Sequence, residues 1–156
     1  MRVFIFLLGL FAIVSAVAGT VTVRPLWIHD GDTFKATLVN KAVMDCRIWG
    51  IDAPELDQAW GKVAKSALIE LIHNKQVEIT IKGKSYNRQV VQITVNGRDI
   101  GLELIKMGLA WHSDKHASEM TKYQQAQKAA EKEKRGLWGD RKPMAPWEWR
   151  ENRKKN

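Results

Sequence analysis

Hydrophobic and polar residues alternate along several short stretches of the chain, and β-branched residues are frequent in them. A period of two with this composition is typical of strands. The expected strands are residues 20–25, 33–39, 42–51, 76–82 and 88–95. Asp30-Gly31 and Asn96-Gly97 lie between apolar runs, where such pairs favour tight hairpins. The alternation therefore predicts a small, curled antiparallel sheet.

A second period, of three and four residues, predicts helices. The predicted helices are residues 58–73, 100–107 and about 118–134. In the first of them Leu68 and Ile72 share an apolar face, as in an amphipathic helix. Pro143 and Pro146 predict an irregular, Trp-containing tail. The order of the elements predicts one α+β domain without an internal repeat.

The first eighteen residues are set apart by their composition. Met1-Arg2 is a short cationic start, residues 3–18 are apolar apart from Gly9 and Ser15, and Ala16-Val17-Ala18 is a small-x-small site. This pattern is typical of a secretory signal peptide. The alternative, a membrane anchor, requires about 20 apolar residues. We therefore expect cleavage after Ala18 and export to the periplasm or the medium.

Charge and cysteine content narrow the class further. The chain has 25 Lys and Arg against 17 Asp and Glu, a net charge of +8, which favours a polyanionic partner. Part of this charge lies in residues 141–155, where a solvated tail that only aids solubility is the alternative. The single cysteine, Cys46, excludes an intrachain disulfide. Its apolar neighbours predict a buried structural thiol.

Two acidic clusters lie where predicted strands end. Asp30 and Asp32 belong to the first hairpin, and Asp52 and Glu55 follow the third strand. Loops on a rigid sheet present such side chains at one rim. Clusters of oxygen ligands suit hard cations, calcium above all.

Two arginines accompany these carboxylates. Arg47 lies inside an apolar strand, so its guanidinium must be paired or must face a site. Arg88 opens the fifth strand. Arginines beside a cation held by carboxylates are suited to stabilising charge on a phosphoryl group. Structural salt bridges are the alternative.

Four short motifs together resemble one family. They are Asp30-Gly31-Asp32-Thr33, the run from Arg47 to Glu55, Tyr86-Asn87-Arg88 and Gly108-Leu109-Ala110. In order and spacing the chain resembles the staphylococcal (micrococcal) nuclease, or thermonuclease, family from about Val21 to Trp138. The residues around Gly136 and Trp147 are similar to its bacterial exported branch.

The resemblance implies an OB-fold-type, five-stranded antiparallel β-barrel with three α-helices. It divides the chain into a signal peptide (1–18), a nuclease-like domain (19–140) and a basic tail (141–156). It also implies an exported, calcium-dependent endonuclease, a hydrolase that cleaves phosphodiester bonds of DNA and RNA with little sugar specificity and leaves 3′-phosphate ends.

Site residues are carried over by motif position. The implied Ca²⁺ ligands are the carboxylates of Asp32 and Asp52 and the carbonyl of Ala53. The implied catalytic residues are Arg47 and Arg88, which would hold the scissile phosphate, and Glu55, which would be the general base. Tyr86 is the implied substrate-binding residue.

The chain departs from the family in several places. Ala53 stands where the family commonly has Thr, and Asn87 where it has Gly, with Asn expected to adopt a positive φ. Trp111 and His112 stand where tyrosines usually contact the nucleotide, so substrate preference is open. His112 and His116 are spaced as zinc ligands could be, but no third ligand accompanies them.

We expect DNA and RNA as substrates of a monomer with no obligate protein partner and no membrane span in the mature chain. One alternative is a non-catalytic nucleic-acid-binding module on the same barrel, and another is a cationic envelope protein. Trp147 and Trp149 could stack on bases or pack the tail against the barrel.

Overall fold

The computed structural model describes residues 19–113 and 121–155 of the 156-residue chain. Its strands are β1 (Thr20–Ile28), β2 (Thr33–Thr37), β3 (Val43–Ile48), β4 (Ile51–Asp52), β5 (Val77–Ser85), β6 (Arg88–Val95), β7 (Arg98–Asp99) and β8 (Trp111–His112). Its helices are α1 (Gly61–Ile72), α2 (Ile100–Lys106), α4 (Thr121–Lys132) and α5 (Pro146–Lys155), with a 3-10 turn at Gly136–Gly139. The predicted signal peptide, the predicted helix start at Ser118 and His116 lie outside the described residues.

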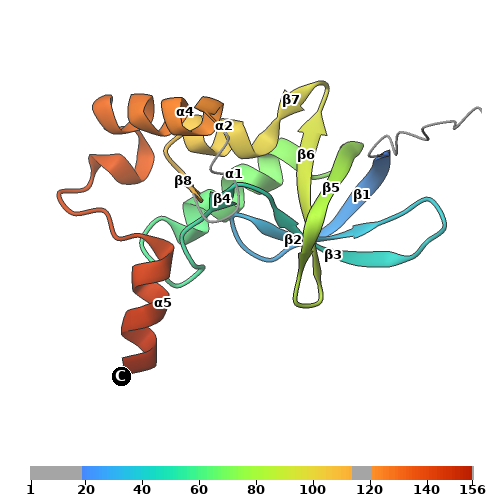
Figure 1. Ribbon diagram of the computed structural model, residues 1–156, viewed down its shortest axis with the longest axis horizontal. Coiled ribbons are helices and arrows are strands. Elements are labelled where there is room, and N and C mark those ends of the chain that lie inside the picture. The colour runs from blue at the N-terminus through green and yellow to red at the C-terminus, as the bar shows by residue number, and fades with distance from the viewer. Residues whose placement is uncertain (1–18, 114–120, 156) are drawn as a thin grey trace, which may run out of the picture.

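Five strands close into a barrel (Figure 1). They follow the order β3-β2-β1-β5-β6, and β3 pairs in turn with β6, while β7 extends the sheet beyond β6. The predicted five-stranded, OB-type barrel is confirmed, but its description as antiparallel is wrong at one place. The closing pair of β3 and β6 is parallel, with Arg47 opposite Val90. Hairpins join the antiparallel pairs β1–β2 and β5–β6, whereas no turn connects β3 to β6.

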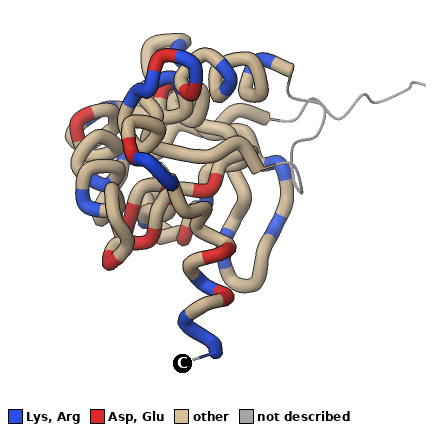
Figure 2. Tube along the Cα trace, turned by 90° about the vertical axis from the view of Figure 1, so that its left-hand side faces the viewer, with Lys and Arg blue, Asp and Glu red and all other residues tan. Residues whose placement is uncertain are grey.

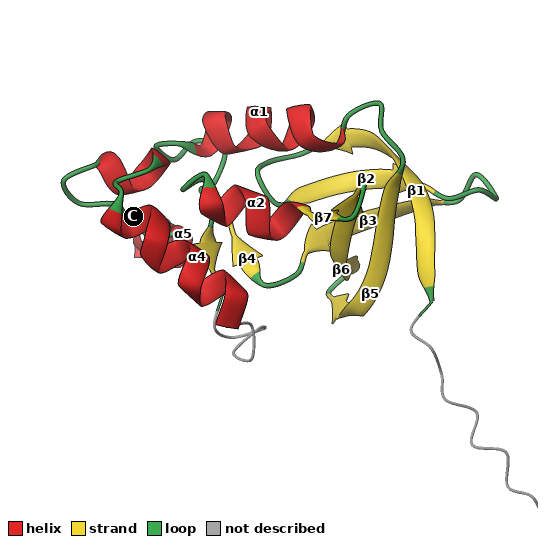
Figure 3. Ribbon diagram, turned by 90° about the horizontal axis from the view of Figure 1, so that it is seen from above, coloured by secondary structure: helices red, strands yellow, loops and turns green. Residues whose placement is uncertain are grey.

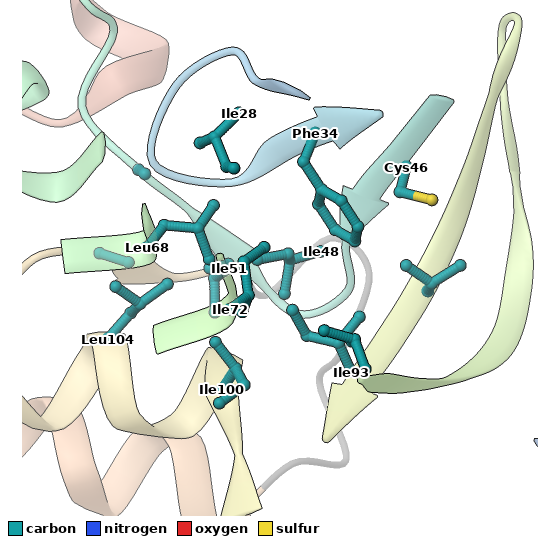
Figure 4. Packing of buried hydrophobic residues seen from close by; sticks show 14 of the residues in the cluster. Ile28, Phe34, Cys46, Ile48, Ile51, Leu68, Ile72, Ile93, Ile100 and Leu104 are labelled. Atoms are coloured by element: carbon teal, nitrogen blue, oxygen red, sulfur yellow. The ribbon is translucent and has the colours of Figure 1, made fainter. Parts of the chain in front are cut away.

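The barrel is filled by alternate side chains of its strands. Each of the five strands contributes a residue that is at most 1% exposed: Val23, Phe34, Ile48, Ile79 and Ile93. Helices α1 and α2 cover the end of the barrel with apolar faces, and the helices gather at this end in Figure 3. Figure 4 shows Leu68, Ile72 and Leu104 from these helices meeting the strand side chains. One continuous core thus supports the rim where the turn between β1 and β2 meets α1.

The predicted strand at 42–51 is two strands, because a turn at Trp49-Gly50 separates β3 from β4. Gly50 has φ +77°, a conformation that favours glycine. The predicted positive φ at Asn87 is wrong, since the left-handed residue of that turn is Tyr86, with φ +54°. Strand β5 consequently continues to Ser85, through residues predicted to turn.

The tail is helical, which corrects the prediction of an irregular segment. Pro146 is the first residue of α5, a position where its missing N–H costs no hydrogen bond. The described residues thus hold four α-helices where three were predicted. In Figure 1, α5 projects away from the other helices, with the C-terminal end at its tip.

Trp111 anchors the segments around the C-terminus. Its ring lies 4.3 Å from that of Trp138 and 5.4 Å from that of Trp147. Trp147 thus packs the tail against β8, which pairs with β4 outside the barrel. Cys46 is fully buried in β3, as predicted. Over the described residues, we find no helix with the length and apolar character needed to cross a membrane.

Candidate active site

The turn between β1 and β2 presents Asp32 toward β3. Asp30 Oδ1 accepts hydrogen bonds from the backbone N–H groups of Asp32 (3.0 Å) and Thr33 (2.8 Å), which fixes the turn. Asp32 is buried, and its carbonyl oxygen accepts a 2.8 Å bond from the Ile48 N–H. A Cβ on Gly31 would lie 2.7 Å from that of Ala53, so only glycine permits this close approach.

Arg47 joins the two predicted metal-binding carboxylates. Its Nη1 donates to Asp32 Oδ1 at 2.6 Å and its Nη2 donates to Asp52 Oδ1 at 2.8 Å. In the pairing of β2 with β3, Arg47 lies opposite Thr33, the first residue of β2. The Arg47 guanidinium therefore lies near the turn that carries Asp32. The predicted convergence of the hairpin and the strand break is therefore observed. Arg47 thus forms the structural salt bridges that were one alternative for it. It also lines a cavity.

Burial dominates the electrostatics of Asp32. It raises the pKa of the carboxyl to about 7, against the charge of Arg47, which lowers it. Burial would lower the pKa of Arg47, but the charges of Asp32 and Asp52 outweigh this and raise it. Burying the ionised carboxylate and guanidinium costs desolvation energy, which lowers the stability of the barrel. The attraction between the two charges offsets part of this cost.

The oxygen donors at this rim fit a hard cation. The Ala53 N–H donates to Asp32 Oδ2 at 2.7 Å, so the Ala53 backbone lies directly beside the first carboxylate. Two carboxylates and a backbone carbonyl are the donor types that calcium takes. No group of three or more His, Cys, Asp or Glu in the described ranges is arranged as a metal site. Asp32 and Asp52 are the two carboxylates that Arg47 joins, and Arg150 links Glu55 to Asp52.

Glu55 is half-buried. One arginine, which was not predicted from the sequence as a site residue, links Glu55 to Asp52. Arg150 of α5 donates to Glu55 Oε1 at 2.7 Å, to Asp52 Oδ2 at 2.7 Å and to Asp52 Oδ1 at 3.1 Å. Sequence analysis counted Arg150 only as part of a basic tail. The signal that could have found it is helical spacing, because Trp147 and Arg150 are three residues apart and therefore share a helix face.

A cavity of about 700 Å³ connects these groups. Arg47, Asp52, Glu55, Arg88 and Arg150 all line it. Arg88 donates from Nη1 to Thr33 Oγ1 at 3.4 Å, a long contact that leaves it available to a ligand. The cavity is thus lined by all three predicted catalytic residues and by Asp52. Asp32 and Ala53 do not line it: Asp32 is joined to the group through Arg47, and Ala53 through its N–H bond to Asp32.

Tyr86 does not join this group. It lies at the tip of the β5–β6 turn with 90% of its surface exposed, and the cavity is lined by its neighbours Ser85 and Arg88 instead. Trp147 of α5 also lines the cavity. His112 is buried, with its ring 6.2 Å from that of Tyr123, and it also lines the cavity.

Fold and site define a class: an OB-type barrel whose rim carries carboxylates and arginines suited to phosphodiester chemistry. The family model described as staphylococcal nuclease homologue matches residues 45–140, which include Arg47, Asp52, Glu55 and Arg88. The chain belongs to the staphylococcal nuclease family, as its motifs predicted. The class of enzyme predicted for it, a nuclease acting as a hydrolase, is the class of that family.

Curated relatives agree with this membership. An uncharacterized endonuclease of Haemophilus influenzae is 36% identical over 152 residues, which cover 96% of this chain and 85% of the relative. An uncharacterized endonuclease of Escherichia coli O157:H7 is 31% identical over 129 residues, 81% and 83% of the two chains. The staphylococcal-like nuclease CAN1 of Arabidopsis thaliana is 35% identical over 112 residues, but the match spans only 33% of that protein.

Proposed function

We propose that the protein is an exported, calcium-dependent endonuclease that hydrolyses phosphodiester bonds of DNA and RNA and leaves 3′-phosphate ends. The observation that carries the proposal is the shared cavity, in which Arg47 and Arg88 face the carboxylates of Asp52 and Glu55. Two guanidiniums can bind the oxygens of a phosphodiester. The carboxylates can hold a cation and accept a proton. A non-catalytic binding module needs no such set of acids.

Asp32 and Asp52, with the carbonyl of Ala53, would hold the cation. When bound, calcium supplies positive charge that polarises the phosphate and orients water. Arg47 and Arg88 hold the non-bridging oxygens and stabilise the charge that develops on them in the transition state. Arg47 bonds to Asp32 and Asp52 through its two terminal nitrogens, so it offers the phosphate mainly its charge. The long contact of Arg88 to Thr33 leaves that guanidinium to bind the phosphate directly.

Glu55 is the proposed general base, because its carboxylate reaches the cavity beside Asp52. It takes a proton from water as the new O–P bond forms. The bond between phosphorus and the 5′ oxygen breaks, and that oxygen takes a proton from solvent water as it leaves, while Glu55 returns its proton to solvent. The phosphate therefore remains on the 3′ side. In the structure Arg150 covers Glu55, so the base must be released before it can act.

Export is proposed from the first eighteen residues, whose pattern is that of a signal peptide. Expression in a bacterial host, fractionation and N-terminal sequencing test it. The expected result is a protein outside the cytoplasm that begins at Gly19. Recovery of the full-length chain in the cytoplasm or in the membrane fraction would contradict export.

The activity is tested by incubating residues 19–156 with supercoiled plasmid and, separately, with RNA. Calcium should support cleavage of both, and a chelator should stop it. Magnesium should substitute poorly, since a sparse oxygen site tolerates the irregular geometry of calcium better than a strict octahedron. Full activity in magnesium with a calcium-specific chelator would exclude the proposed metal. Binding of nucleic acid without cleavage in any divalent cation would favour the non-catalytic module.

A further inference from the structure

Arg150 binds the site's carboxylates from outside the barrel. It donates from Nη2 to Asp52 Oδ2 and from Nη1 to Asp52 Oδ1 and Glu55 Oε1. Arg47 shares Asp52 Oδ1, so guanidinium groups occupy both oxygens of this carboxylate. A divalent cation that binds Asp52 must therefore displace at least one of these contacts.

The two arginines are not equally easy to displace. Arg47 lies on a closed barrel strand, with its side chain 21% exposed and also bound to Asp32. Arg150 lies on α5, with its side chain 41% exposed. Residues 151–155, which follow it, are all exposed. Moving Arg150 disturbs no strand pairing, whereas moving Arg47 leaves the buried Asp32 without its counter-charge.

The start of α5 is held independently of Arg150. Ala145 and Pro146 are buried, and the Trp147 ring packs 5.4 Å from that of Trp111. Gln58 Nε2 also donates to the Met144 carbonyl at 2.8 Å. Arg150 can therefore leave the carboxylates while the first turn of the helix stays on the barrel.

The cation and the Arg150 guanidinium are both positively charged, so each opposes binding of the other to Asp52 and Glu55. Three carboxylates (Asp32, Asp52 and Glu55) face two guanidiniums, those of Arg47 and Arg150. Loss of the Arg150 charge makes this group more negative and strengthens its attraction for a divalent cation. A bound cation in turn repels the Arg150 guanidinium, and this coupling is reciprocal.

We propose that Arg150 and a divalent cation compete for Asp52 and Glu55. Arg150 positions both carboxylates in the cation-free protein and sets the affinity with which the cation binds. The inference rests on the proposed function, because the cation site at Asp32 and Asp52 belongs to it. Displacement by the cation also explains how Glu55 becomes available as a base.

The test is calcium binding measured by titration calorimetry without nucleic acid, on the mature chain and two variants. Arg150→Gln removes the competitor. Arg153→Gln is the matched control, because Arg153 lies one turn further along α5, carries the same charge and pairs with Asp57 at 2.7 Å. Figure 2 shows these basic residues interleaved with acidic ones along α5. We expect about tenfold tighter binding for Arg150→Gln, equivalent to about 1.4 kcal/mol, and a change of less than about twofold for Arg153→Gln.

Hydrogen exchange of residues 145–155 gives a second readout. Calcium should accelerate exchange of α5 in the natural chain, because the Arg150 contacts are lost, but should have little effect in Arg150→Gln. Binding by Arg150→Gln that is no tighter than by Arg153→Gln, or is weaker, would overturn the competition and leave the proposed function standing. Absence of calcium binding in all three proteins would overturn both.

Discussion

Strand β3 and helix α5 each supply an arginine to the same carboxylate, and the two arginines are held very differently. Arg47 reaches Asp52 from strand β3 of the barrel, and its two ion pairs fix it between Asp32 and Asp52. Arg150 reaches Asp52 from a helix that touches the barrel mainly through its first turn. Its pKa is raised chiefly by the hydrogen bonds to Asp52 and Glu55, so these carboxylates are its main partners.

The difference separates a structural cation from an exchangeable one. Arg47 neutralises a carboxylate that burial has already made costly to ionise, so the barrel depends on it. Arg150 binds the half-buried Glu55 and the buried Asp52. Asp52 keeps Arg47 as a partner when Arg150 leaves, so loss of Arg150 leaves no buried carboxylate without a counter-charge. Changes at Arg47 should therefore affect folding and catalysis together, and changes on the α5 side should affect the site alone.

Glu55→Gln should have the largest effect on activity. Glu55 contacts Arg150 but not Arg47, so its replacement tests the exchangeable side of the site. The variant keeps the shape of the side chain and removes the proton acceptor, and kcat should fall by about 10²–10⁴-fold. Thermal stability should barely change, because Arg150 keeps its bonds to Asp52. Steady-state kinetics on DNA in calcium, beside a melting curve, measures both.

Asp57→Asn is the control for that variant. Asp57 is an exposed carboxylate two residues away, paired with Arg153, and it does not line the cavity of the site. Its replacement should leave kcat within about twofold, since surface changes act weakly. An unchanged kcat in Glu55→Gln would mean that another group activates the water.

Arg47→Gln should lower the free energy of unfolding by about 3–5 kcal/mol, because it leaves Asp32 buried without its partner. Arg150→Gln should lower it by less than Arg47→Gln does, because Asp52 keeps Arg47 as a partner. The pKa of Asp32, already about 7, rises further without Arg47, above its unfolded value of 3.8. Folding of the Arg47→Gln variant then binds a proton at Asp32. The contribution of Asp32 to the free energy of unfolding is therefore highest at low pH and falls as pH rises through the folded pKa.

Urea unfolding of the Arg47→Gln and Arg150→Gln variants, at pH 5 and pH 8 without calcium, tests these two predictions. The deficit of Arg47→Gln should be larger at pH 8, where the uncompensated charge must form. Equal losses in the two arginine variants would remove the distinction between a structural and an exchangeable cation.

Much of the barrel and its site could be predicted from the sequence because both depend on local patterns. Strand β6 runs from Arg88 to Val95 as the alternation predicts, and Asn96-Gly97 forms the expected turn. Asp32 lies in the turn before β2 and Asp52 ends β4, directly after the turn that follows β3. They converge because β2 pairs with β3, whose Arg47 bonds to both carboxylates. Strands β3 and β6 pair in parallel and are not joined by a hairpin turn. The alternation of residues alone could therefore not predict the direction of this pairing.

The α5 side was missed for physical reasons. Pro146 ends a helix when it lies inside one but is accepted at the first position, and composition does not say which case applies. Arg150 lies 98 residues from Asp52 along the chain. A charged residue on an exposed helix has many possible partners, so only the docked tail identifies the one it contacts. Tyr86 was predicted at the site from its motif, but the turn leaves it in solvent.

Arg88→Lys should separate catalysis from stability most cleanly. Its single long hydrogen bond to Thr33 Oγ1 contributes little to the fold. A lysine keeps the charge but loses the planar fork that binds two phosphate oxygens, so activity should fall by about 10²-fold. Arg98→Lys, on a surface ion pair with Glu103, is the control and should keep full activity. Near-natural turnover in Arg88→Lys would make Arg88 a structural residue.

The smallest expected effect is at Cys46, which adjoins Arg47 on β3 and reports whether that strand opens. The thiol is fully buried, and burial, with the charge of Asp45, raises its pKa to about 12. Only about 10⁻⁴ of it is thiolate at pH 8, so a maleimide should label the native chain very slowly. Arg150→Gln should leave this rate unchanged, because it removes no contact of β3. Arg47→Gln should accelerate labelling, since Asp32 no longer holds the rim closed. Acceleration in Arg150→Gln as well would show that α5 stabilises the barrel itself, and the contrast between the two arginines would then be one of degree.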